Sequence, residues 1–137
     1  MGRMSPLHNP AAGLVAAQAL PPVSRNGGAS NAAVNGSSID LRGKRGAYFT
    51  VSVGALTGTA NYLAYLQTGD NPGDAANANW TNINTTTYSN AGLTVKTNAN
   101  TVWEMDVDAS ASGAQHVRAV LVPDANVSVI GMTAITY

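Results

Sequence analysis

The chain of 137 residues lacks cysteine and contains only two histidines. Without cysteine it has no disulfides, no cysteine-based zinc site and no thiol chemistry. A nucleophilic triad needs a general base, and the histidines are His8, near the start of the chain, and His116, at the beginning of an apolar run. Neither position is typical of a catalytic base. We therefore expect that the protein is not an enzyme and uses no cofactor or metal.

Charged residues are also scarce, at 10% of the chain against about 25% in ordinary soluble domains. The formal net charge is zero, but the charges are unevenly distributed. Residues 1–46 contain five basic residues and one acidic residue, a net charge of +4, whereas residues 47–137 contain two basic and six acidic residues, a net charge of −4. The two parts therefore attract each other, within one copy or between copies. Scattered basic residues are a weak signal for nucleic acid, and we expect no nucleic-acid partner.

Large side chains and long apolar runs are few. Aromatic residues make up only 6% of the chain and alanine supplies much of its apolar content, so a domain of this length has a thin core. Association with further subunits is the usual remedy when disulfides and metals are missing. The longest nearly apolar stretch, Pro10 to Leu20, is shorter than the roughly 20 residues that span a bilayer, and we expect no membrane partner. This stretch is either a helix that Asn9 caps or an extended arm.

Alternation of apolar and polar residues is the main structural signal. Every second residue from Ala47 to Val53 is apolar, which is the pattern of a strand with one buried face. Thr101 to Asp108 alternates in the same way, and His116 to Val122 is nearly continuous in apolar residues, as expected of a central strand. Further short strands are expected at Ser37–Leu41, Tyr62–Gln67, Trp80–Ile83, Leu93–Val95 and Val127–Tyr137.

About eight strands separated by turn-forming segments predict an all-β fold, a jelly-roll-like antiparallel β-sandwich. The first 46 residues contain most of the prolines and little periodicity. We therefore predict an extended N-terminal arm with a first strand at residues 1–46 and a β-sandwich body at residues 47–137, together forming one domain.

Two groups of polar residues fall on expected strands. His116 and Arg118 share one strand face, where they bind an anion or, as is commoner, pair across the sheet. Glu104, Asp106 and Asp108 share a face of another strand. Three acids in line are typical of a solvated stripe rather than of a catalytic pair. Such a stripe protects a sheet edge or receives basic residues of a neighbouring copy.

Aromatic residues and one turn offer two further binding hypotheses. Trp80, with Tyr62, Tyr65 and Tyr88, is a candidate platform for a sugar, although core packing is the default for aromatic side chains. The segment Asp70 to Asp74 has oxygen ligands close together but lacks the regular spacing of a calcium loop. A turn is the better interpretation of that segment.

Five segments between residues 35 and 137 form a set: Asn35–Leu41, Gly46–Gly54, Tyr65–Gln67, Asn79–Ile83 and His116–Val122. Together they resemble the small decoration or cement proteins on the capsids of tailed bacteriophages. The resemblance implies a jelly-roll-like domain that binds as a homo-oligomer, a dimer or trimer, to the outside of an icosahedral capsid. There it would clamp adjacent major capsid proteins, and it would have no catalytic residues.

The implied protein is a structural virion component on the outer capsid surface, assembled in the cytoplasm of a bacterial host. Its partners would be the major capsid protein and further copies of itself. Arg25, Arg42, Lys44 and Arg45 are then the candidate partner contacts, because they would meet acidic patches on the shell or on an adjacent copy. The alternative is a carbohydrate- or receptor-binding β-sandwich module of a phage fibre or tail that uses Trp80.

Overall fold

The computed structural model describes residues 14–25, 33–56, 62–69, 80–83, 95–96, 99–109, 115–123 and 128–137. They contain ten strands: β1 (Val15–Arg25), β2 (Val34–Asn35), β3 (Ile39–Asp40), β4 (Gly46–Leu56), β5 (Tyr62–Gly69), β6 (Trp80–Asn82), β7 (Val95–Lys96), β8 (Thr101–Asp108), β9 (His116–Pro123) and β10 (Ser128–Thr136). Within these residues, no helix has the length and apolar character needed to cross a membrane.

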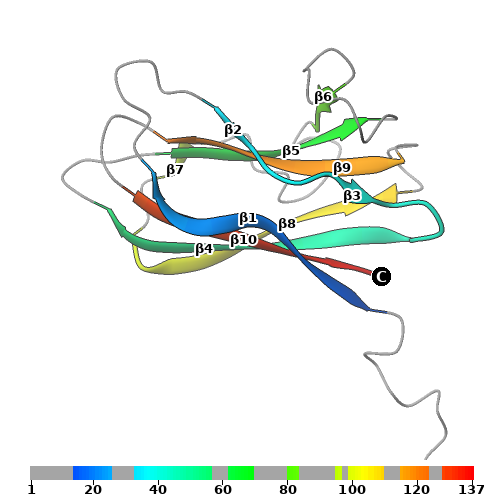
Figure 1. The fold of residues 1–137 in the computed structure, drawn as a ribbon, viewed down its shortest axis with the longest axis horizontal. Coiled ribbons are helices and arrows are strands. Elements are labelled where there is room, and N and C mark those ends of the chain that lie inside the picture. The colour runs from blue at the N-terminus through cyan, green and yellow to red at the C-terminus, as the bar shows by residue number, and fades with distance from the viewer. Residues whose placement is uncertain are drawn as a thin grey trace, which may run out of the picture.

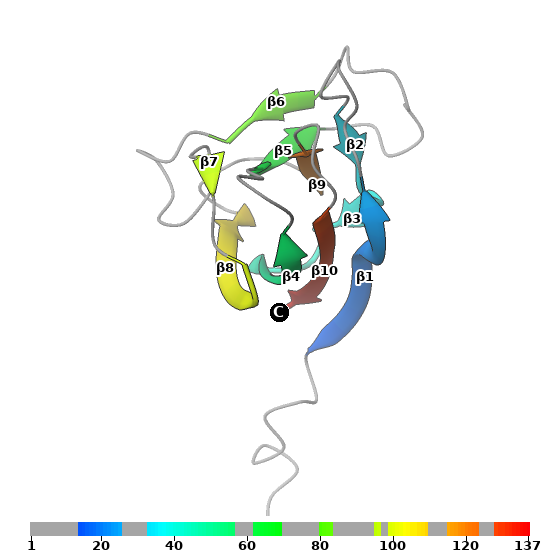
Figure 2. The ribbon, with the colours of Figure 1, turned by 90° about the vertical axis from the view of Figure 1, so that its left-hand side faces the viewer.

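The strands form two antiparallel sheets, which face each other as two layers (Figure 1). Sheet A has the order β1-β10-β4-β8, and sheet B has the order β2-β9-β5-β6. In sheet B, β3 also pairs with β9 and β7 also pairs with β5. Figure 2 shows the two layers from one end, with β1 curving up beside β3 at one side.

The strand order identifies the fold as a jelly roll. We count β2 and β3 as one interrupted strand and β6 and β7 as another, because each pair lies along a single neighbour. The ten strands then occupy eight positions, in the orders 1-8-3-6 in sheet A and 2-7-4-5 in sheet B. This arrangement of eight strands in two sheets is that of a jelly roll. The sequence-based prediction of a jelly-roll-like antiparallel sandwich is confirmed.

The core lies between the sheets and follows the expected alternation. In β4, every second residue from Ala47 to Val53 points inward and is at most 4% exposed. Phe49 pairs with Met105 of β8 on one side and Ala134 of β10 on the other, and all three are fully buried. Sheet B closes the core from the opposite side with a set of inward residues of its own: Ala64, Leu66, Val117, Ala119 and Leu121.

One polar contact crosses this core between the sheets. The indole Nε1–H of Trp103, on β8, donates a 2.7 Å hydrogen bond to the hydroxyl oxygen of Tyr62, on β5. The two rings are stacked, with centroids 6.4 Å apart. Burial raises the pKa of Tyr62, so the neutral phenol is favoured. The contact therefore pairs both polar groups and ties β8, an edge strand of sheet A, to sheet B.

From residue 14 onward, the described part of the arm expected at residues 1–46 belongs to the two sheets of the sandwich. Val15–Arg25 is a strand of sheet A paired with β10, so over its described residues the Pro10–Leu20 stretch is extended rather than helical. β2 and β3 belong to sheet B. The pairing of β1 shifts register on both sides of Leu20, and the Ala19 carbonyl accepts a 3.0 Å hydrogen bond from the Ser37 N–H near β2. β1 thus closes one side of the sandwich.

Candidate interaction surface

The outward side of sheet A, which we call the open face, consists mainly of exposed and half-buried residues. Strand pairing aligns its residues in rows across the sheet, such as Glu104 of β8, Thr50 of β4, Thr133 of β10 and Gln18 of β1. Glu104, Thr133 and Gln18 are exposed and Thr50 is half-buried. The open face comprises Gln18, Tyr48, Thr50, Ser52, Val102, Glu104, Asp106, Asp108, Gly131, Thr133 and Ile135. Its middle consists mainly of uncharged hydroxyl groups.

The predicted acidic stripe lies on this open face. Glu104, Asp106 and Asp108 alternate with the inward-facing Trp103, Met105 and Val107, so the one wet and one dry face expected for this strand are confirmed. A hydrogen bond with Glu104 raises the pKa of Tyr48, the neighbouring phenol on β4. One carboxylate oxygen of Asp106, Oδ1, is buried and has no hydrogen-bond partner.

Two of the predicted contact residues, Lys44 and Arg45, lie at the end of the open face. They line an open hollow of about 470 Å³ together with Asp108 and Tyr137. The Arg45 N–H donates a 2.7 Å hydrogen bond to the Tyr137 carbonyl, and the Arg45 carbonyl accepts one of 2.8 Å from Ala109. The loop that carries both cations is therefore held by the end of β8 and by the last residue of the chain.

Two glycines allow this arrangement. Gly43 has φ +76°, and the Lys44 N–H donates to the Leu41 carbonyl over 2.9 Å, which makes a tight turn before the cations. At Gly46, an added Cβ would lie 2.8 Å from the Tyr137 hydroxyl and would also strike the Val107 carbonyl. The missing side chain at Gly46 lets the Tyr137 ring lie across the strand.

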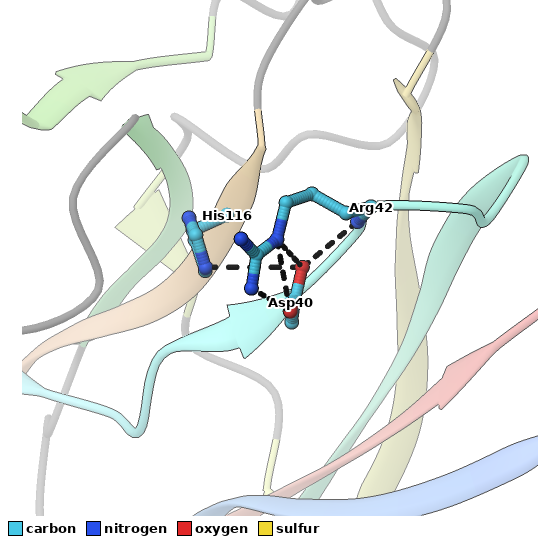
Figure 3. A network of polar contacts seen from close by, with 3 residues as sticks. All are labelled: Asp40, Arg42 and His116. Carbon is cyan, nitrogen blue, oxygen red and sulfur yellow. Dashed lines mark hydrogen bonds and ion pairs between the residues drawn. The ribbon is translucent and has the colours of Figure 1, made fainter.

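Arg42 is engaged within its own chain. Figure 3 shows its guanidinium folded onto the Asp40 carboxylate, with Nε to Oδ1 at 3.0 Å and Nη2 to Oδ2 at 2.7 Å. These hydrogen bonds hold the pKa of Asp40 well below its ordinary value of 3.8. Both side chains remain about half exposed or more, so the pair adds little stability. A bidentate partner makes Arg42 less available for an external contact than Lys44 or Arg45.

His116 also lies near the Asp40 carboxylate. Its Nε2 lies 3.8 Å from Asp40 Oδ1, which is too long for a hydrogen bond, and its buried Nδ1 has no partner. The imidazole is nearly fully buried. Arg25, the fourth predicted contact residue, ends β1, and its side chain lies outside the described residues.

The outward side of sheet B, which we call the covered face, is buried over four of its residues, whereas Tyr65 and Gln67 are half-buried and Asn82 is exposed. It comprises Tyr65, Gln67, Trp80, Asn82, His116, Arg118 and Val120. Arg118 is 4% exposed, donates from Nε to Gln67 Oε1 over 2.8 Å, and lies 4.4 Å from the centre of the Trp80 ring. Gln67 Nε2 in turn donates to Asn82 Oδ1 over 2.8 Å. His116 and Arg118 therefore share a face, and the expected cross-sheet pairing is confirmed for Arg118.

This burial counts against the sugar platform. Trp80 is 8% exposed and its ring stacks on a guanidinium, so the face that a sugar would need is occupied. Tyr62 is in the core, and Tyr88 lies outside the described residues. The Asp70–Asp74 segment is also outside them. Among the described side chains, no group of three or more histidines, aspartates or glutamates is arranged to hold a metal ion.

Sequence reasoning missed two features of these surfaces. The Asp40 partner of Arg42 was readable from the spacing of two residues within a turn, since such a pair can fold onto itself. Tyr137 and Asp108 reach the hollow only through the pairing of β4 with β8 and of the chain end with Gly46. No local sequence pattern indicates that these two residues lie beside Lys44 and Arg45.

Comparisons with known proteins give distant structural likenesses. No family model matches the chain, and no curated protein is significantly similar in sequence. A chain in the structure of infectious bursal disease virus, Gx strain, is 14% identical over 90% of this chain, which spans 31% of that chain, with a TM-score of 0.45. A Bacillus endospore appendage protein, from a family of disulfide-linked pili, is 12% identical, with coverages of 99% and 97% and a TM-score of 0.40.

The SPBc2 prophage-derived protein YomS is 15% identical, with coverages of 89% and 94% and a TM-score of 0.40. Identities and TM-scores this low carry no functional argument. The jelly-roll assignment rests on the strand order of this chain.

Proposed function

We propose that this protein is a structural virion component that decorates the outside of a phage capsid as a homo-oligomer and cements adjacent major capsid subunits. In this role the sandwich lies across a junction between capsid subunits, and many weak contacts add up through multivalency. The protein acts through binding alone and performs no chemical reaction. The outer surface of the sandwich is therefore its functional part, and we propose no cofactor.

The observation that carries the proposal is the jelly-roll strand order combined with a broad open face. Jelly rolls occur in capsid and lectin domains, so the fold restricts the function by analogy only. Between those two classes, the lectin alternative needs an accessible aromatic platform. Trp80 is buried under Arg118, whereas the open face exposes hydroxyls, acids and the Lys44–Arg45 pair. Without an accessible aromatic platform at Trp80, we favour a protein contact over a sugar contact.

The structure changes how the role is tested. Deletion of residues 1–34 would remove β1 and the buried Leu20, so the sandwich itself would be damaged. A gene knockout avoids this problem. The phage or prophage whose genome carries the gene is grown with and without it, and purified particles are heated while DNA release is measured.

The cementing role predicts that the protein is present on purified wild-type particles and that knockout particles release DNA at a lower temperature. Purified protein added back should bind the outside of knockout particles and restore their heat resistance. Absence of the protein from wild-type particles, or equal heat resistance without it, would contradict the proposal. A major capsid gene next to this gene is a cheaper first observation in its favour.

A further inference from the structure

We propose that the open face of sheet A binds a second copy of this chain, with Lys44 and Arg45 of one copy against Glu104 and Asp106 of the other. The inference rests on the proposed homo-oligomer and names the surface and the charges that form it. It follows from three observations: the charges form no salt bridge with another described residue, they lie on one face, and the surface beside them is uncharged.

The first observation is that these charges form no salt bridge with another described residue. Among the described residues, every salt bridge involves Asp40, with Arg42 or His116 on the other side. Lys44, Arg45, Glu104 and Asp106 therefore have no salt bridge within the described part of the chain. Opposite charges of a second copy would supply the ion partners that these residues lack within the described part of the chain.

The second observation is that cations and acids lie on one face. Gly46, which follows Arg45, pairs with Asp108, and Asp106 and Glu104 continue the same side of β8. With about 3.4 Å per residue along a strand, Glu104 lies about 14 Å from Asp108 at the hollow. A two-fold axis that lies parallel to sheet A, across its strands and in front of the open face midway between these positions, would set the hollow of each copy against the stripe of the other. Each contact would then be made twice, as in an isologous dimer.

The third observation is that the area beside the charges is easily desolvated. Thr50, Ser52 and Thr133 are short and uncharged, and Val102 at the margin is 65% exposed. Neutral hydroxyls lose less on leaving water than charges do. Both charge signs on one face also favour a self-complementary partner over nucleic acid or an anionic membrane, because the acidic stripe would repel either one. A second copy carries the matching pattern by definition.

The experiment is a charge swap followed by sedimentation equilibrium over a concentration series, without capsids. Two reversed variants are prepared, K44E/R45E and E104K/D106K, together with the quadruple variant that combines them. Circular dichroism and thermal unfolding establish that each variant is folded. If a reversed variant does not fold, K44Q/R45Q and E104Q/D106N replace the two reversals.

We expect the wild type to self-associate and each reversal to raise the dissociation constant by about tenfold or more. An equimolar mixture of the two reversed variants should associate again, and so should the quadruple variant. Added salt should weaken the wild-type association. The inference is overturned if the wild type is monomeric throughout, if the reversed or neutral variants associate like the wild type, or if neither the mixture nor the quadruple variant regains association.

These outcomes are separate from those of the capsid test. If two copies do not associate in solution, binding of single copies to particles can still be measured. If the protein does not bind particles, association of two copies in solution can still be measured. The two proposals can therefore fail independently.

Discussion

The two outer faces of this sandwich come from sheets of similar construction, yet they differ in burial and in the kind of polar residue they carry. The open face of sheet A exposes Thr133, Ser52 and Glu104. On the covered face of sheet B, Arg118, His116 and Trp80 each expose less than a tenth of their surface. Polar residues on the first face interact with solvent or a partner. Those on the second face must find partners inside the molecule.

The difference in burial between the two faces distinguishes polar residues that stabilise the fold from those that are available for an external contact. Arg118 and Lys44 are both cations that sequence reasoning singled out. Arg118 is held by Gln67 and stacked on Trp80, so it stabilises the fold. Lys44 lines an open hollow and has no salt bridge to a described residue, so it is suited to an external contact. Substitutions on the covered face should therefore change stability, and those on the open face should change association.

The largest effect is expected from a matched pair of glutamines, one on each face. Gln67→Leu leaves the buried guanidinium of Arg118 without this acceptor and should lower the free energy of unfolding by about 1.5–3 kcal/mol. Gln18→Leu, on the exposed side of β1, should change it by no more than about 0.5 kcal/mol. Urea denaturation measures both. Equal losses at the two positions would remove the distinction between the faces.

A smaller effect is expected from a reciprocal exchange of valine and threonine. Val120→Thr places a hydroxyl at a position of 1% exposure on the covered face and should destabilise by about 1–3 kcal/mol, unless it finds a partner. Thr133→Val on the open face keeps the β-branched shape and should stay within about 0.5 kcal/mol. Thermal and urea unfolding of both variants provide the comparison. A tolerated Val120→Thr would indicate that the covered face is open to water.

The smallest effect is expected at the exposed rim, from the Asp40–Arg42 pair. Arg42 lowers the pKa of Asp40 in the folded state, so the pair stabilises the fold above the ordinary carboxyl pKa and this contribution is lost as the pH falls through the lowered value. Asp40→Asn should therefore flatten the loss of stability below about pH 4. The measurement is the urea midpoint over a pH series.

The control for this pH dependence is Arg42→Gln, which should flatten the acid-side loss in the same way as Asp40→Asn. The double variant should add nothing further, because one interaction underlies both effects. An unchanged acid slope in either single variant would show that this pair does not control stability at low pH.

Much of the fold was readable from the sequence because its central strands carry strong patterns. The alternation at Ala47–Val53 and at Thr101–Asp108 correctly predicts which side chains enter the core. The nearly continuous apolar run of His116–Val122 correctly indicates a strand buried on both sides. These signals are local, because each one is a pattern of apolar residues within a single strand.

The parts that escaped prediction depend on distant pairing. β1 is rich in alanine, contains Pro21 and Pro22, and shifts register twice, so it has no clean period. The edge position leaves one side of the backbone without a partner strand, and the register shift between Leu20 and Val23 takes both prolines out of the pairing with β10. The candidate surface was predicted in part: Lys44 and Arg45 were named, but Tyr137 joins them only because the end of the chain lies beside Gly46.

The most direct test of the account is hydroxyl-radical footprinting of the intact protein under dilute and under associated conditions, read out by mass spectrometry. We expect association to protect Tyr48 and Tyr137 on and beside the open face, while Tyr65 and Trp80 on the covered face stay equally reactive. Protection confined to Tyr65 and Trp80, with Tyr48 and Tyr137 unchanged, would contradict the assignment of the open face as the interaction surface.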